Sequence, residues 1–295
     1  MSNLNAKNII KWSTISISLL VLIIAFKCSC FACCEPGDSF DNPIIVDSTA
    51  DLESIAEDVN EGNNYTGKFF ILTKDIVIEN NDNGKSLPTK WQSIGSINTA
   101  FDGTFNGNGH FIKCNINDFS TNSTNSLFGT IGKNGNIQNL NVTGVINSTS
   151  ASSTSILCYT NYGNIENCTT NVNVTALGPL SSIAYENHGT IESCHIHGHL
   201  SNEGDLCSAG VIKNNGIIRK CSINAILKNS ANANNSNISG ISIYNNNKIE
   251  DCVVLSNIKD IFSNKHINHK NETLGICCFN NGKINNCDYH RKLFI

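Results

Sequence analysis

Cysteine is the residue type whose number and spacing first suggest chemistry, because 14 of the 295 residues are cysteine. A zinc knuckle site needs two Cys-x-x-Cys pairs. Cys30 and Cys33 have that spacing, but no second pair follows them. Disulfides involving Cys158, Cys207 or Cys277 are an open alternative for a protein in an oxidising compartment. The cysteines therefore predict no metal site.

Three histidines form a second candidate cluster. His195, His197 and His199 alternate along a predicted strand, so their side chains share one face and could hold a metal between neighbouring coils. No acidic residues that would orient such ligands lie nearby in the sequence. We therefore favour an exposed polar row over a metal site.

Acidic residues could supply a general acid and base. Glu166, Glu192 and Asp251 fall near equivalent repeat positions and could align on one outer face, as in β-helix enzymes that cleave polysaccharides. Such enzymes need paired carboxylates, and neither an adjacent Asp-Asp pair nor a basic partner row is present. We predict a protein that is not an enzyme, with no catalytic, cofactor-binding or metal-binding residue.

The N-terminal segment predicts export. Lys7 and Lys11 precede the apolar run Ile15–Phe26, which is shorter than the roughly 20 residues that span a bilayer. We interpret residues 1–34 as a signal peptide or a retained signal anchor. Cys33, preceded by Ala32, is a candidate lipid anchor, although Cys30 and Phe31 fit such a site poorly. We expect any membrane contact to be made only through this segment.

A linker, residues 35–47, and an N-terminal cap, residues 48–100, follow. Ser48 and Asp51 have capping-box spacing, and apolar residues then recur at helical spacing to Gly62, which predicts one helix of about three turns. The run KFFILTKDIVI that starts at Lys68 combines β-branched residues with alternation and predicts a strand.

Residues 101–295 contain degenerate repeats. Each unit has a short apolar strand, an Asn/Gly turn, and a second strand that runs through an Ile-x-x-Cys or Ile-x-x-Leu anchor. The anchors lie 28, 26, 27, 31 and 35 residues apart and are Leu140, Cys168, Cys194, Cys221, Cys252 and Cys287. This is the scale of one coil of a solenoid. We therefore interpret the anchor cysteines as small core residues.

The repeat also predicts local geometry. Alternation places Cys194 and Ile196 on the inner face, and Ile191 with His195 on the other. The turns tolerate positive φ, and Asn side chains in register can bond one another along the stack. These turns are Asn134-Gly135, Asn215-Gly216 and Asn281-Gly282. The variable stretches Lys228 to Asn237 and Lys259 to Asn271 are predicted loops, where we expect recognition.

The block WQSIG, then AFDGTFNGNGHFIKCNI and SLFGTIGKNGNIQNLNVTGVI, resembles the entry module of GLUG-repeat proteins, and the later units resemble their degenerate repeats. The likeness covers residues 44 to 291. It departs from the pattern where Gly-Leu-x-Gly would stand, as in ILCY from Ile156 and GICC from Gly275. The resemblance implies an all-β, right-handed parallel β-helix on a secreted or surface protein, often an adhesin. Some immunoglobulin A metalloproteases contain such repeats, but their His-Glu-x-x-His motif is absent.

Composition limits the function classes. The chain is 40% hydrophobic, 15% charged and has a net charge of −4, with its 20 Lys and Arg scattered, so nucleic acid is not an expected partner. We predict an extracellular or cell-surface β-solenoid that binds a glycan or an extracellular or host protein. Two alternatives are a structural self-associating surface protein, whose terminal RKLFI would cap or expose the last coil, and a divergent or inactive carbohydrate enzyme.

Overall fold

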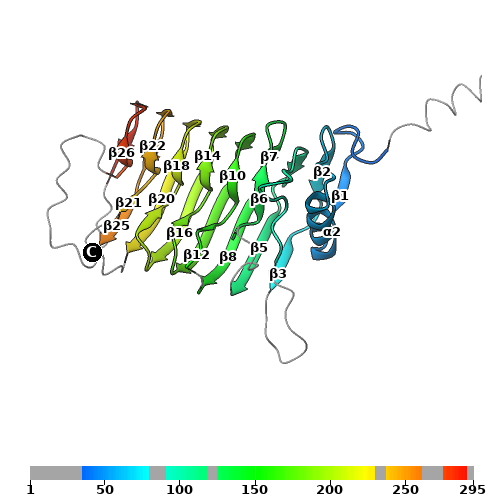
Figure 1. Ribbon diagram of the computed structural model, residues 1–295, viewed down its shortest axis with the longest axis horizontal. Helices are drawn as coiled ribbons and strands as arrows, with labels where there is room; N and C mark the ends of the chain where they lie inside the picture. Colours follow the sequence, from blue (N-terminus) through cyan, green and yellow to red (C-terminus); the bar gives the residue numbers. More distant parts are fainter. Residues whose placement is uncertain are drawn as a thin grey trace, which may run out of the picture.

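Short parallel strands, each one coil from the next, make up most of the molecule. The computed structural model describes residues 35–79, 91–117, 125–149, 151–229, 237–260 and 275–290. Its coils lie side by side in one elongated stack, with a helix at the N-terminal end (Figure 1). The strands form four sheets, and every strand pair within them is parallel. The predicted parallel β-solenoid is therefore confirmed.

Sheets 1 and 2 run the length of the stack. Sheet 1 contains, in spatial order, β1 (Ile44–Val46), β2 (Phe69–Leu72), β4 (Thr104–Asn106), β7 (Asn136–Gln138), β11 (Asn164–Glu166), β15 (Thr190–Glu192), β19 (Ile217–Arg219), β23 (Lys248–Glu250) and β27 (Lys283–Asn285). Sheet 2 contains β3 (Ile76–Glu79), β5 (Phe111–Asn117), β8 (Asn141–Ser148), β12 (Thr169–Ala176), β16 (His195–Asn202), β20 (Ser222–Asn229), β24 (Val253–Val254) and β28 (Asp288–Tyr289), and β25 (Asn257–Asp260) also pairs with β20.

Sheets 3 and 4 complete the coils. Sheet 3 contains β6 (Phe128–Ile131), β10 (Cys158–Asn161), β14 (Ala184–Asn187), β18 (Val211–Asn214), β22 (Ser242–Asn245) and β26 (Cys277–Asn280). Sheet 4 contains β9 (Thr154–Ser155), β13 (Leu180–Ser181), β17 (Leu206–Ser208) and β21 (Asn237–Ser239). A full coil therefore passes through sheets 3, 1, 2 and 4 before it enters the next coil.

The predicted N-terminal helix is confirmed as α2 (Thr49–Asn60). Ser48 is its N-cap, and Ser48 and Asp51 form both hydrogen bonds of a capping box, which satisfies donors that the first turn leaves free. One face of the helix is buried: Leu52, Ile55, Ala56 and Val59. Figure 1 shows the helix beside β1 and β2, at the end of the stack.

The run that starts at Lys68 forms two strands in two sheets instead of one. Residues of β2 pair with β4 in sheet 1, whereas β3 pairs with β5 in sheet 2. The chain turns between them, where Asp75 accepts a hydrogen bond from the Phe111 backbone N–H. Rungs of the solenoid thus begin before residue 101, the start expected for the repeats.

A corner before each anchor corrects the predicted alternation. Cys194 and Ile196 are buried as expected, but Ile191 is buried too, with 1% of its surface exposed. Ser193 has φ of 54°, and this left-handed residue turns the chain from sheet 1 into sheet 2, which reverses the inside and outside positions. The same conformation occurs at Asn139, Asn167, Lys220, Asp251 and Asn286.

Positive φ therefore lies at these corners and not at the Asn-Gly turns where it was predicted. The turn glycines have a different role. A Cβ at Gly216 would lie 2.1 Å from the carbonyl oxygen of Gly189, and one at Gly189 would lie 2.0 Å from that of Gly163. Glycine is required there because the backbones of neighbouring coils approach so closely.

The predicted bonding between turn asparagines is confirmed from Asn281 through Asn246 to Asn215. A second, buried Asn ladder lies at the junction of sheets 3 and 1. Asn161 donates to Asn187 at 2.8 Å, Asn187 to Asn214 at 2.9 Å, and Asn214 to Asn245 at 2.7 Å. These four side chains have no exposed surface. Each amide satisfies the next, so the ladder places polar groups inside the solenoid without leaving them unpaired.

Candidate functional site: a groove across the coils

A concave outer surface forms where sheet 4 meets sheet 3. Ile212 and Ile243 lie on the outer face of sheet 3, beside the core and not part of it, yet neither has exposed surface. Strand β21 lies close to this face, since the Cys278 thiol lies 3.2 Å from the Ile238 carbonyl oxygen. The bend between the two sheets therefore creates a groove.

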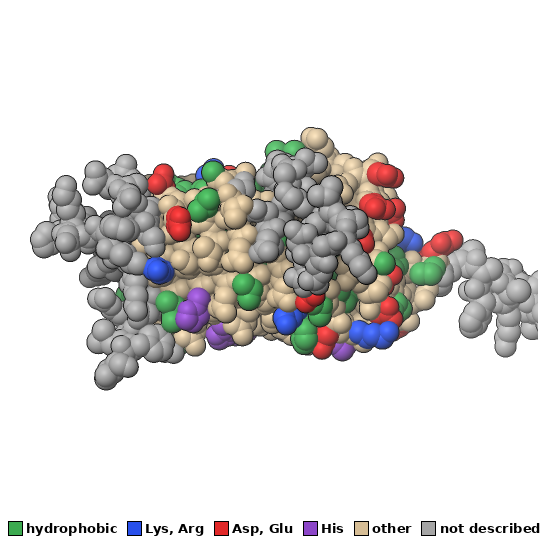
Figure 2. Space-filling view, turned by 90° about the horizontal axis from the view of Figure 1, so that it is seen from below, with side chains coloured by type: hydrophobic (Ala, Val, Ile, Leu, Met, Phe, Trp, Pro, Cys, Tyr) green, Lys and Arg blue, Asp and Glu red, His purple; other side chains and the backbone are tan. Residues whose placement is uncertain are grey.

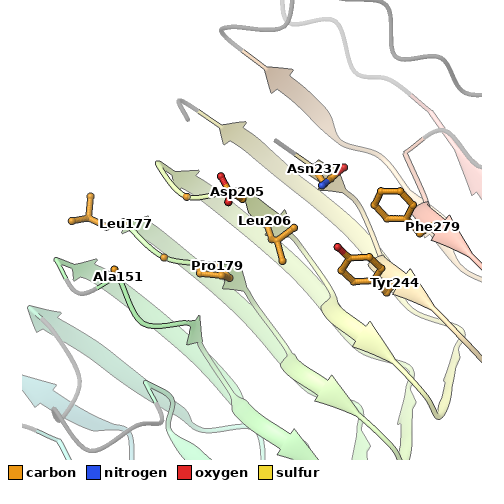
Figure 3. A pocket seen from close by; sticks show the side chains of 10 residues that line it. Ala151, Leu177, Pro179, Asp205, Leu206, Asn237, Tyr244 and Phe279 are labelled. Carbon is orange, nitrogen blue, oxygen red and sulfur yellow. The ribbon is translucent and has the colours of Figure 1, made fainter. Parts of the chain in front are cut away.

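The groove has a volume of about 640 Å³ and crosses several coils (Figure 3). One wall is made of the turns that enter sheet 4, and the other of two aromatic side chains on β22 and β26. We call this surface the coil groove. Its lining residues are Ala151, Leu177, Gly178, Pro179, Gly204, Asp205, Leu206, Asn237, Tyr244 and Phe279.

Buried asparagines hold the sheet 4 wall in place. The Asn202 side chain donates to the Gly178 carbonyl oxygen, and that of Asn229 donates to the Gly204 carbonyl oxygen at 3.1 Å. Both asparagines are fully buried. A Cβ at Gly178 would lie 2.3 Å from the Ser152 carbonyl oxygen, so this turn is packed directly on the turn before it. The wall is therefore built as part of the stack.

Register creates the aromatic wall. Tyr244 pairs with Phe279 across β22 and β26, and their ring centroids lie 5.1 Å apart with planes inclined by 13°. Figure 3 shows the two rings next to each other, on the side of the groove that faces Leu206 and Asn237. Phe279 is 48% exposed, so an apolar surface remains open to a ligand.

Charges beside the groove are mostly paired. Lys213 occupies the register position next to Tyr244, contacts Glu186 at 2.7 Å and lies 5.7 Å from the Tyr185 ring centroid. Burial opposes ionisation of Glu186, but hydrogen bonds from Lys213 and His188 outweigh it and lower the pKa of this carboxyl. Asp205 is the one charged side chain that lines the groove, and it joins no ion pair within the described residues.

The three predicted histidines lie on one outer face of β16, as expected. His195 Nδ1 lies 2.7 Å from the Ser222 hydroxyl, and His197 stands in register between Asn171 and Asn224. His199 lines a separate hollow of about 340 Å³ on sheet 2. In the part of the chain that the structure describes, no three His, Cys, Asp or Glu side chains converge as metal ligands.

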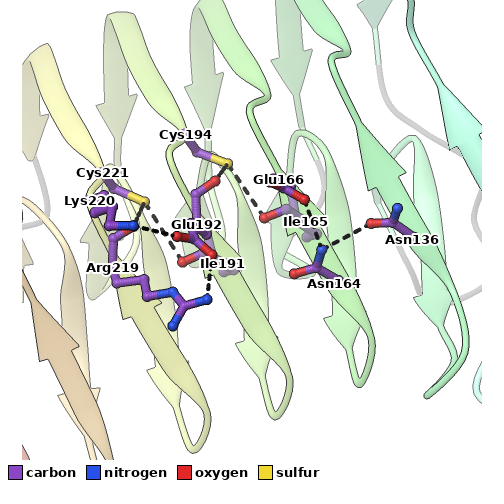
Figure 4. A network of polar contacts seen from close by, with 10 residues as sticks. All are labelled: Asn136, Asn164, Ile165, Glu166, Ile191, Glu192, Cys194, Arg219, Lys220 and Cys221. Atoms are coloured by element: carbon purple, nitrogen blue, oxygen red, sulfur yellow. Dashed lines mark hydrogen bonds and ion pairs between the residues drawn. The ribbon is translucent and has the colours of Figure 1, made fainter.

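The predicted acidic row needs a correction. Glu166 and Glu192 are in register, but the residue that continues their row beyond Arg219 is Glu250, whereas Asp251 occupies the left-handed corner position. Asp251 stands one residue before its anchor, in register with Asn167 and Ser193, whereas Glu166, Glu192 and Glu250 each stand two residues before theirs. Arg219 and Lys220 contact Glu192 at 2.5 and 3.0 Å and lower the pKa of its carboxyl (Figure 4).

The anchor cysteines lie one coil apart. Cys168, Cys194, Cys221 and Cys252 are in the core, and Cys287 is partly exposed against it. The backbone N–H after Cys194 donates to the carbonyl of the preceding anchor, Cys168, at 2.9 Å, and each anchor thiol donates to the carbonyl two residues before it. Contact with the Cys221 thiol and burial raise the pKa of Cys252 to about 12. All ten cysteines in the described ranges, including Cys158, Cys207 and Cys277, are free thiols.

Several predicted features lie outside the described residues. These include Cys33 with the whole N-terminal segment, the terminal RKLFI, and most of the two predicted loops. Lys228 belongs to β20, and Lys259 to β25. Among the helices that the structure describes, none has the length and apolar character needed to cross a membrane.

Sequence reasoning missed the coil groove. Tyr244 and Phe279 each stand eight residues before their anchors, so the repeat alignment could have placed them in one row. It did not show that this row faces a concave surface, because the strands of sheet 4 contain only two or three residues and leave little periodic signal.

Comparisons with known proteins support the solenoid fold but do not assign the chain to a family. No family model matches the sequence. A segment is 34% identical over 110 residues to halomucin of Haloquadratum walsbyi, and one is 30% identical over 108 residues to a "Putative Gly-rich membrane protein" of Evansella cellulosilytica. Each match covers 35% of this chain but 1% and 11% of those proteins. The structure is similar to that of a "putative immunoglobulin A1 protease" from Bacteroides ovatus, with a TM-score of 0.53 and 16% sequence identity. The similarity covers 87% of this chain and 86% of the other, so the two chains share a fold.

Proposed function

We propose that the protein is a non-enzymatic, surface-displayed or secreted β-solenoid of the GLUG-repeat type that binds an extracellular ligand, a glycan or a protein, in the coil groove. The observation that carries this proposal is the groove itself. It is concave, combines an aromatic wall with polar side chains, and is held by buried hydrogen bonds. Preformed hollows with these properties are typical of binding sites.

The placement of the acidic residues supports binding without catalysis. A glycoside hydrolase needs two carboxyl groups across the scissile bond. Asp205 is the one carboxylate in the groove lining. Glu186 does not line the groove, and its carboxylate is paired with Lys213 and His188. Glu192, the carboxylate that the sequence offered as a partner, is paired with Arg219 in sheet 1.

Two further observations support display outside the cell. The N-terminal apolar run has the form of an export signal. Segments of the chain are also similar to halomucin and to a membrane protein. Figure 2 shows a face made largely of uncharged side chains and backbone, with Lys and Arg dispersed, which disfavours nucleic acid as a partner.

The test combines localisation with ligand capture. The full-length chain with a C-terminal tag is expressed in its source cell, and intact cells and culture medium are probed with an antibody against the tag. The purified chain is then screened on an array of glycans and extracellular matrix proteins. We expect surface or medium signal and a reproducible ligand. Signal only from lysed cells would contradict display, and turnover of an array glycan would contradict the non-enzymatic assignment.

A further inference from the structure

We infer that the coil groove binds an uncharged polysaccharide chain that lies along the solenoid axis. This inference rests on the proposed function and specifies its ligand class. Four properties of the groove carry it: its backbone groups are used, its aromatic wall is flat, its lining has one charge, and it extends across successive coils.

The inner strands of the groove offer no open backbone edge to a peptide strand. Strands β13 and β17 of sheet 4 are each paired on both sides, and so is β22 of sheet 3. Their N–H and C=O groups therefore bond to the coils above and below. A bound peptide could not extend these sheets sideways, which is the usual way that an extended peptide is recognised on a sheet. Side chains must recognise the ligand.

The side chains suit sugar rings. A pyranose ring has apolar C–H groups on its faces and hydroxyls around its edge, so it needs flat apolar surface next to polar groups. Tyr244 and Phe279 supply two nearly parallel rings, and Leu206 faces them across the groove. The Asp205 carboxylate lies next to this apolar surface and can accept hydrogen bonds from hydroxyls.

The charge of the groove lining favours an uncharged polymer. The single charged lining group is the Asp205 carboxylate, which is exposed. The nearest cation on the aromatic wall, Lys213, is held by Glu186 at 2.7 Å. An anionic polysaccharide would meet Asp205 with no cation in the described lining to offset it, whereas neutral hydroxyls can donate to this carboxylate.

The groove is elongated along the axis. Its lining comes from the levels of β9, β13, β17 and β21 on one wall and of β22 and β26 on the other. Since coils are spaced by about 4.8 Å, these levels extend over about 20 Å. A chain of several sugar units fits this length, and each added unit would contact another coil.

Binding of defined oligosaccharides tests the inference. The purified full-length chain is titrated in a calorimeter with β-1,4-glucose, β-1,3-glucose, α-1,4-glucose and β-1,4-mannose oligomers of two to six units. We expect at least one series to bind, with affinity that rises with length. Phe279→Ala and the milder Phe279→Leu should each weaken the longest oligomer, the former roughly tenfold. Asp205→Asn should retain binding.

Tyr162→Ala is the matched control, because Tyr162 is an exposed aromatic residue that stacks on His188 and does not line the groove. The affinity of this variant for the oligosaccharides should equal that of the natural chain. An anionic polymer bound in preference to neutral ones would overturn the uncharged assignment. A matrix protein whose binding Phe279→Ala abolishes would overturn the polysaccharide assignment but keep the groove as the binding site. Ligands that both Phe279 variants bind normally would overturn the groove itself.

Discussion

At the residue scale, asparagine gives this solenoid its internal polar order. A buried amide side chain is costly unless its donors and acceptor are all engaged. Asn187 meets this requirement, because it accepts from Asn161 and donates to Asn214, and Gly163 N–H is engaged by the Asn161 oxygen in the turn. The ladder therefore fixes the register of each coil against the next as well as the turn that follows it.

We expect Asn187→Ala to lower the free energy of unfolding by about 2 to 3 kcal/mol, because it removes the buried hydrogen bonds that Asn187 accepts from Asn161 and donates to Asn214. Urea unfolding followed by circular dichroism measures this loss. Asn246→Ala is the control, since Asn246 bonds Asn215 at 2.9 Å in an exposed ladder and should change stability by no more than about 0.5 kcal/mol. Equal effects of the two variants would contradict a special role for the buried ladder.

Thiol burial gives a second prediction at this scale. Burial raises the pKa of Cys114 and of Cys207 to about 12, so these thiols are protonated and shielded at neutral pH. Cys278 and Cys287 are partly exposed, and the other eight described cysteines are buried. We expect iodoacetamide to modify at most these two in the native protein, and all ten after denaturation without reductant, as counted by mass spectrometry of the region after Cys34. Fewer additions in denaturant would reveal disulfides.

At the element scale, the sequence predicted the features that recur in each coil but missed the corner between sheets 1 and 2. The anchors, the capping box at Ser48 and the bonding between turn asparagines all follow from residue spacing, and the structure confirms them. The corner at Ser193 was missed because its left-handed φ falls on Asn, Ser, Lys or Asp in different coils, so no residue type marks it. The missed corner hid the four-sheet plan from which the groove arises. Asp251 occupies that corner position, so it does not share the row of Glu192.

Glu192 should make stability depend on pH. Arg219 and Lys220 lower the pKa of its carboxyl in the folded state, so its stabilising effect is present above the unfolded pKa of about 4.3 and is lost as pH falls through the lower, folded value. We expect Glu192→Gln to be less stable than the natural chain at pH 7, with a deficit that shrinks as the pH falls below about 4.3, in urea unfolding across this range. Glu203→Gln, at an exposed position without an ion pair among the described residues, should show no difference at pH 7. A Glu192→Gln deficit that does not shrink as the pH falls would rule out the ion pairs as its cause.

At the scale of the whole molecule, each coil contacts mainly the coils on either side of it. Strand order in all four sheets steps from one coil to the next, so interactions between distant coils contribute little. The molecule is thus modular along its axis, and the coil groove, which crosses these modules, has a length set by the number of coils. The number of coils should therefore set both the stability of the solenoid and the length of the ligand that the groove can hold.

Removal of one exact coil tests this modularity. Deleting residues 182–208 joins Ser181 to Ala209, and because Ser181 and Ser208 are register partners, the chain re-enters sheet 3 at the correct place. Asn214 would then take the place of Asn187 and accept the hydrogen bond from Asn161. We expect a folded solenoid, shorter by about 4.8 Å in small-angle scattering, with the circular dichroism of a parallel β protein. Deleting residues 182–200 instead joins sheet 4 to the interior of β16, out of register, and should abolish folding. If both deletions fold equally well, or neither folds, coils are not independent units and the groove cannot be shortened one rung at a time.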